Sequence, residues 1–90
     1  MAKKKSAPGL VFPCEFPLKV IGKDEDHFFD FVVEVVSHHV PELPVELFST
    51  HSSTGGNYLS VSVTFIAQSR AQVDALYEEL STHKRVLMAL

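Results

Sequence analysis

The stretch NYLSVSVTFIA, residues 57–67, constrains the fold more than any other part of the sequence. Apolar side chains occupy every second position, at Leu59, Val61, Val63 and Phe65, and alternate with tyrosine, serine and threonine. A period of two predicts a β-strand with one buried face and one open face. The chain must therefore supply further strands and a layer that covers the apolar side.

A second alternating segment, CEFPLKVIG at residues 14–22, places Phe16, Leu18 and Val20 on one side. Pro17 interrupts it, because proline has no N–H to give to a strand ladder. We therefore expect either a bulge at Pro17 or firm pairing only after it.

Two more segments complete the predicted sheet. VELFSTHS, residues 45–52, predicts a strand before the long one, and KRVLMAL, residues 84–90, predicts the last strand. In that last strand we expect Val86, Met88 and Leu90 to face the core, since they share one phase of the alternation.

The segment from Lys23 to Glu42 has the period of an amphipathic helix. Asp24 is the predicted N-cap, and Pro41 ends the helix. One helical face carries Phe28, Val32, Val35 and His39.

A second helix is predicted over residues 69–83. Ser69 followed by Gln72 is a capping-box pattern, and Val73, Leu76 and Leu80 form its apolar stripe.

The loop SSTGGN, residues 52–57, has the hydroxyls and glycines that a phosphate-binding nest requires. A phosphate-binding P-loop also needs a lysine after the glycines and a helix after the lysine. Here a strand follows the glycines. The pattern favours a hairpin turn, and the alternative is a loop at the rim of a ligand site.

The resulting order, β-α-β-β-α-β, is that of the α+β ferredoxin-like sandwich. We predict a four-stranded antiparallel sheet in the order 4-1-3-2, with both helices on one face. Residues 10–90 form the predicted single domain. Residues 1–9, which include Lys3, Lys4 and Lys5, form a predicted flexible basic tail.

Composition narrows the function further. The net charge of −3 gives no general attraction to nucleic acid. The single cysteine, Cys14, indicates the reducing cytoplasm, and the longest apolar runs are too short to span a membrane. The five histidines lack the spacing of a metal site, so we predict no metal or cofactor, and we expect His39 to bond a backbone carbonyl at the core rim.

The open face of the predicted sheet is the candidate site, because no catalytic motif occurs in the sequence. Its predicted contact residues are Lys19, Asn57, Tyr58, Ser60, Ser62 and Thr64. Two readings of this face stay open: a solvated β-surface, or an interface for a protein partner or a small metabolite. Nucleic-acid binding through the same face is the alternative function, although the aromatic pattern of RNA-binding sheets is missing.

The stretches EFPLKVIG, VVEVVSHH before Pro41, GNYLSVSV, ALYEEL and VLMAL together resemble the YbeD-like family of small bacterial proteins. The match runs from about Leu10 to Leu90. The resemblance implies a fold similar to ACT domains, which are regulatory modules that bind small molecules and often pair as homodimers. It also implies a link to lipoate metabolism through gene association. The family has no established catalytic residues to carry over, so we predict a non-enzymatic regulatory or adaptor module.

Overall fold

The computed structural model of the chain describes residues 11–90. The strands are β1 (Cys14–Lys23), β2 (Ser49–Ser52), β3 (Tyr58–Ala67) and β4 (Val86–Ala89), and the helices are α2 (Phe28–His39) and α3 (Arg70–Thr82). A short 3-10 turn, η1 (Val45–Leu47), precedes β2. The predicted basic tail, residues 1–9, lies outside the described residues.

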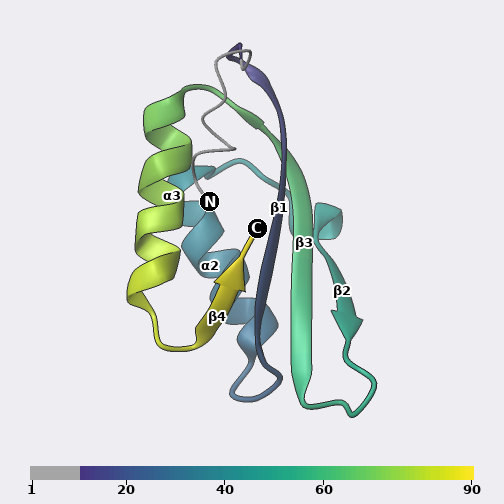
Figure 1. Cartoon of the computed structure of the whole chain (residues 1–90). Coiled ribbons are helices and arrows are strands. Elements are labelled where there is room, and N and C mark those ends of the chain that lie inside the picture. Colours follow the sequence, from purple (N-terminus) through teal and green to yellow (C-terminus); the bar gives the residue numbers. More distant parts are fainter. Residues whose placement is uncertain (1–10) are drawn as a thin grey trace.

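The four strands form one antiparallel sheet in the order β2-β3-β1-β4, which confirms the predicted order 4-1-3-2. Figure 1 shows α2 and α3 on the same side of this sheet. None of the described helices or strands covers the other side, and this arrangement confirms the predicted ferredoxin-like sandwich.

The core lies between the sheet and the two helices. The alternation predicted for β1 and β3 holds along both strands, since every apolar residue of the predicted phase is buried. The helices contribute Phe28, Val32, Val35, Val36, Val73, Leu76 and Leu80. Burial of this apolar area is the main term that stabilises the fold.

Pro17 does not disturb the sheet, so the expected bulge or delayed pairing is wrong. Pairing with β3 runs without a shift from Cys14 opposite Ala67 to Lys23 opposite Tyr58. The backbone of Lys19 bonds to Leu90, and Pro17, two residues earlier, directs its backbone to the same side. Within the described residues no strand pairs there, because β4 pairs with β1 only between Val20 and Gly22. The missing N–H therefore costs no ladder bond.

The first helix begins later than predicted, and Asp24 is not its N-cap. The N-cap is His27, whose side chain makes no capping bond. Asp26 and His27 both have left-handed backbones, with φ of 52° and 57°. Arg85 holds this turn from the far end of the sequence: its Nη2 donates to the carbonyls of Glu25 at 2.6 Å and Asp26 at 2.7 Å.

The strand predicted over residues 45–52 is shorter than expected. Residues 45–47 form η1, in which Leu47 N–H donates to the carbonyl of Pro44 at 3.1 Å. Phe48 is buried, and Val45 and Leu47 are exposed. The fixed φ of Pro44 suits the start of this turn, which leaves only Ser49–Ser52 for β2.

The loop between β2 and β3 is the predicted hairpin turn. Ser53 N–H donates to the carbonyl of Tyr58, and the Ser53 hydroxyl accepts from Tyr58 N–H. Gly56 has φ of +76°, a conformation that side chains with a Cβ rarely adopt.

The predicted cap of α3 is confirmed. The Ser69 hydroxyl accepts from Gln72 N–H at 3.2 Å. The Gln72 side-chain oxygen accepts a hydrogen bond from the N–H of Gln68 and not from that of Ser69. The capping box is thus closed one residue earlier than the standard pattern.

Candidate functional site

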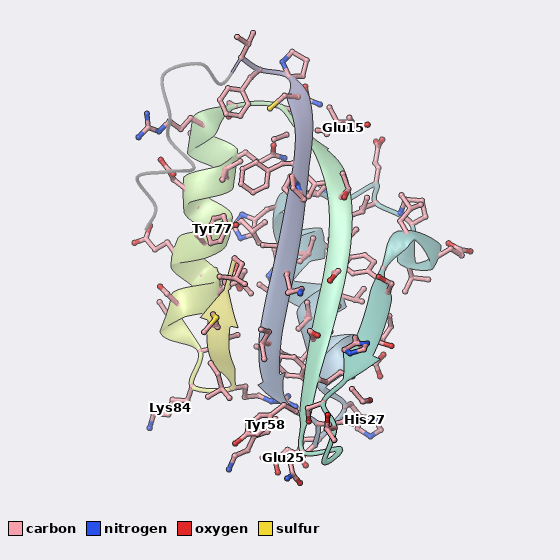
Figure 2. All side chains as sticks on the ribbon, turned by 45° about the vertical axis from the view of Figure 1, so that its right-hand side comes forward. Glu15, Glu25, His27, Tyr58, Tyr77 and Lys84 are labelled. Carbon is pink, nitrogen blue, oxygen red and sulfur yellow. The ribbon has the colours of Figure 1, made fainter. Side chains whose placement is uncertain are left out.

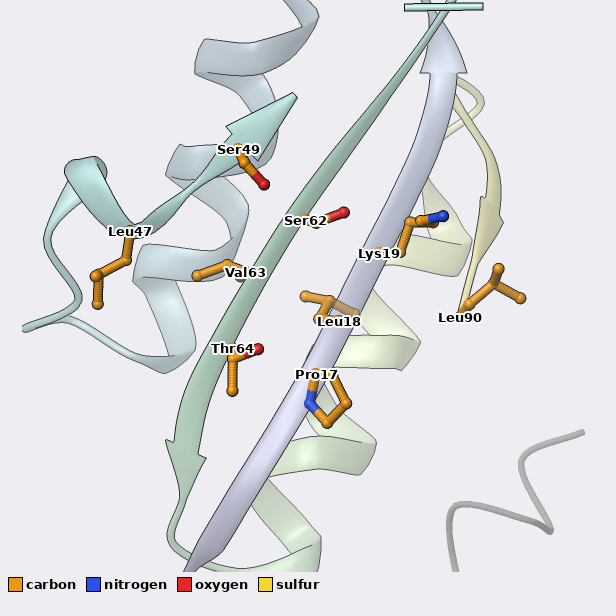
Figure 3. Close-up of a pocket in the computed structure, with 9 residues that line it drawn as sticks. All are labelled: Pro17, Leu18, Lys19, Leu47, Ser49, Ser62, Val63, Thr64 and Leu90. Carbon is orange, nitrogen blue, oxygen red and sulfur yellow. The ribbon is translucent and has the colours of Figure 1, made fainter. Parts of the chain in front are cut away.

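A shallow groove crosses the middle of the open sheet face. Its volume is about 550 Å³. Figure 3 shows the residues that line it, which come from β1, β3, η1, β2 and the segment after β4: Pro17, Leu18, Lys19, Leu47, Ser49, Ser62, Val63, Thr64 and Leu90.

Sheet register places the polar groups of this groove. Lys19 on β1 lies opposite Ser62 on β3, and Ser62 in turn lies opposite Ser49 on β2. Pro17 lies opposite Thr64 in the next row. The period of two sends all five side chains to the face that the helices leave open.

Leu47 and Leu90 stand on opposite sides of the groove (Figure 3). Leu90 is held in place by its backbone: its N–H donates to the Lys19 carbonyl at 2.8 Å, and its own carbonyl accepts from Lys19 N–H. The Tyr77 hydroxyl also donates to the Leu90 carbonyl at 2.8 Å. Burial raises the pKa of Tyr77 to about 12, so the hydroxyl keeps this proton at ordinary pH.

The orientation predicted for the last strand is wrong for two of its three residues. Met88 and Leu90 are about half exposed, at 50% and 48%, and Val86 and Ala89 pack against the core. The cause is a register shift beside Gly22, where Gly22 pairs with Val86 but Ile21 pairs with Met88. The extra residue between these pairs reverses the phase of the strand.

A second cluster joins the two helices around the Glu79 carboxylate. His39 Nε2 lies 2.6 Å from Glu79 Oε1, and His38 Nδ1 lies 3.2 Å from Oε2. His83 Nε2 is 3.8 Å from Oε2. The bond from His39, followed by the bond from His38, lowers the pKa of Glu79.

This cluster corrects the partner predicted for His39, which bonds a carboxylate and not a backbone carbonyl. The separation of 40 residues between the two side chains explains why the sequence pattern did not indicate it. Over residues 11–90, no group of three or more His, Cys, Asp or Glu side chains is arranged to hold a metal ion.

Comparison with known proteins places the chain among its relatives. The family model described as "Protein of unknown function (DUF493)" matches residues 7–90. The chain belongs to the DUF493 family. This assignment confirms, at the level of the family, the resemblance drawn from the sequence.

Curated relatives of this DUF493 chain carry the name UPF0250. The UPF0250 protein RSc0326 of Ralstonia nicotianae is 40% identical over 81 residues, which cover 90% of this chain and 84% of the relative. The UPF0250 protein PA3998 of Pseudomonas aeruginosa is 40% identical over 84 residues, covering 92% and 90%. Neither name states an activity.

A solved structure shares the fold. The solution structure of protein HP0495 from H. pylori aligns with a TM-score of 0.67 at 17% identity, covering all of this chain (100%) and 94% of the other. At that identity the likeness supports the architecture alone.

Three of the six predicted contact residues of this DUF493 chain line the groove: Lys19, Ser62 and Thr64. Ser60 lies further along β3, and its hydroxyl donates to the His51 carbonyl at 3.1 Å. Tyr58 lies at the far end of the molecule from Glu15, as Figure 2 shows. The carbonyl of Asn57 accepts from the N–H of Asp24, which ties the hairpin to the turn before α2.

Sequence reasoning missed much of the groove. Leu90 was assigned to the core, and Leu47, Ser49 and Pro17 were not considered as contacts. The open face is also more apolar than predicted, because Met88, which was expected in the core, is about 50% exposed.

No helix in the described part of this DUF493 chain is long and apolar enough to cross a membrane.

Proposed function

We propose that this DUF493 protein is a non-enzymatic binding module of the cytoplasm that acts through its open sheet face. The observation that carries the proposal is the groove between Leu47 and Leu90, lined by three of the predicted contact residues. Its occupant is a protein partner or a small metabolite. A regulatory or adaptor role in lipoate metabolism, implied by the family resemblance, belongs to the same proposal.

The groups in the groove support binding rather than acid–base chemistry. General acid–base catalysis uses titratable side chains within hydrogen-bond reach of the reacting atoms. Among the described residues that line the groove, Lys19 is the one with a charged side chain, and the other polar groups are hydroxyls. Aliphatic walls and a few polar groups are typical of a binding site.

Two further predictions from the sequence accompany this proposal. Self-association into a homodimer stays a prediction, favoured by the short exposed edge strand β2. Nucleic-acid binding is the competing function, and the experiment below includes it as an outcome.

The test is a capture experiment with three immobilised forms of the chain. One form is wild type, the second carries Ser62→Glu and Thr64→Glu in the groove, and the third carries Ala71→Glu and Ala75→Glu on the exposed side of α3. The last two add equal charge, so a difference between them reports the place of the substitutions and not the added net charge. Circular dichroism checks that each is folded.

We expect a protein or metabolite that binds the wild type and the α3 form and is lost from the groove form. Retention by all three forms would move the site away from the open face. Capture of RNA that weakens steeply with salt would favour the nucleic-acid alternative.

A further inference from the structure

We infer that the groove binds a small anionic molecule with a short aliphatic chain, with Lys19 as its charge partner. This inference rests on the proposed function and narrows the occupant to one chemical class. It follows from the charge, the unused hydroxyls and the apolar walls of the groove, each of which is set out below.

The charge of the groove determines which kind of ligand head group it binds. Lys19 has the one charged side chain among the described residues that line the groove, and Figure 3 shows it beside Ser62. The whole chain carries −3, so long-range attraction does not gather anions. Selectivity for an anion must therefore come from direct contact with the Lys19 ammonium group.

The hydroxyls beside Lys19 are available to a ligand. Within the described residues, the side chains of Ser49, Ser62 and Thr64 make no hydrogen bond. The Ser60 hydroxyl, which lies outside the groove, instead donates a hydrogen bond to the His51 carbonyl. A hydroxyl donates one hydrogen bond and suits the oxygen of a carboxylate. Ser62 is best placed, because it lies directly opposite Lys19 in the sheet register.

The walls suit an aliphatic chain. Leu47 is 55% exposed and Leu90 is 48% exposed, and the ring of Pro17 lies between them in the next row of the sheet. From β1 to β2 the groove spans two strand spacings, about 10 Å. A ligand with its anionic head at Lys19 can therefore lay a short chain against Leu47 or Leu90.

The size of the groove sets the expected affinity. About 550 Å³ lies within the range of small-molecule sites. The groove is open to solvent, so it covers only part of a ligand. We expect binding of the isolated probe in the millimolar range.

A competing anion site must be separated from this one. A second hollow, of about 380 Å³, is lined by Lys23, Glu25, Lys84, Arg85 and Leu87. It also carries cations, but Glu25 opposes an anion there, and the Arg85 guanidinium already bonds two carbonyls. Lys84, which is exposed, serves as the matched control for Lys19.

The experiment is a titration of the full chain, labelled with ¹⁵N, followed by the amide signals of Lys19, Ser62, Thr64 and Leu90. The probes are hexanoate, hexylammonium, 1-hexanol and acetate. The first three have the same chain length and differ in the charge of the head group, whereas acetate keeps the carboxylate but lacks the chain. The proteins are wild type, Lys19→Met and Lys84→Met, with thermal unfolding to confirm that each is folded.

We expect saturable shifts at the groove with hexanoate and weaker or no binding of the other three probes. Lys19→Met should weaken hexanoate binding by up to about fivefold, the loss expected for one exposed ion pair. Lys84→Met should bind hexanoate as the wild type does.

Three results would overturn the inference: equal binding of hexanoate and hexylammonium or 1-hexanol, shifts centred on Lys84 and Arg85, or no saturable shift with hexanoate. Its failure is distinguishable from failure of the proposed function. If hexanoate does not bind but the Ser62→Glu, Thr64→Glu form still loses a captured partner, the open face binds something else. If no partner is lost either, both proposals fail.

Discussion

Replacement of Gly22 by alanine is expected to destabilise the fold strongly, because no space exists for a side chain there. A Cβ at this position would lie 2.4 Å from the backbone oxygen of Arg85 and 2.5 Å from the ring of Phe28. Phe28 is fully buried, at 1% exposure, so its ring has nowhere to move. The β-bulge beside Gly22 brings these atoms together.

The size of the effect follows from two opposing terms. Overpacking of a rigid core costs up to about 3 kcal/mol. Alanine also restricts the unfolded chain more than glycine does, and this raises the free energy of unfolding by roughly 0.4–1 kcal/mol. We therefore expect the free energy of unfolding to fall by about 2 kcal/mol, and the midpoint temperature to fall by roughly 8–16 °C for a domain of this size.

Two other glycines supply the controls. At Gly55 a Cβ would meet only the Asn57 side-chain nitrogen at 3.4 Å, so alanine should be nearly neutral. At Gly56 nothing lies within 4 Å, but φ is +76°, and alanine should cost about 1 kcal/mol through backbone strain. Urea and thermal unfolding, followed by circular dichroism, measure all three variants. The reasoning is refuted if Gly22→Ala loses less stability than Gly56→Ala.

Two smaller effects are expected at the helices. Glu79→Gln removes the carboxylate that bonds His38 and His39, and should cost about 1 kcal/mol. Because the pKa of Glu79 is lowered in the folded state, this stabilisation is present above the ordinary glutamate pKa and is lost as the pH falls through the lowered value. Ser69→Ala removes the cap that accepts from Gln72 N–H and should also cost about 1 kcal/mol. Urea unfolding, repeated from neutral to acidic pH for the Glu79 variant, measures both.

Matched controls lie next to each site. Glu78→Gln changes an exposed carboxylate on the same helix and should leave stability nearly unchanged. Ser81→Ala removes a hydroxyl that bonds the Glu78 carbonyl inside α3, where no cap depends on it. A loss that is equal for Glu78→Gln and Glu79→Gln, or for Ser81→Ala and Ser69→Ala, would contradict the assigned roles.

The elements that were predicted well carry their information in neighbouring residues. The alternation of β3 separates buried from open positions correctly along the whole strand. The pair Ser69 and Gln72 caps α3 within four residues of chain. Such patterns can be read from the sequence because the period and the cap are local properties of the backbone.

The elements that were predicted incorrectly depend on distant partners. Asp24 has the composition of an N-cap, but α2 begins after His27 because the turn before it is held by Arg85, 60 residues away from Glu25 in the sequence. Residues 45–47 alternate like a strand, but they turn after Pro44 and leave Leu47 at the rim of the groove.

The residues of the candidate site also fall into those that the local sequence pattern predicted and those that depend on distant contacts. Lys19, Ser62 and Thr64 were found because each lies on the open phase of a strand whose buried phase is strongly apolar. The walls were missed. Leu90 reaches the groove only because the bulge beside Gly22 reverses the phase of β4, and no residue pattern in the last strand indicates that reversal.

The sequence by itself determined the order of the elements, the buried face of the two central strands and the family of the protein. The order of the elements and the buried faces depend on periods, caps and turn residues that act over a few positions of the chain. The family follows instead from the resemblance of several stretches to known proteins, which the family model over residues 7–90 supports. Only the tertiary structure decided where α2 begins, which way Met88 and Leu90 face, and that a groove lies between Leu47 and Leu90. Those features are set by contacts between segments far apart in the sequence, whose relative register forms only when the sheet assembles.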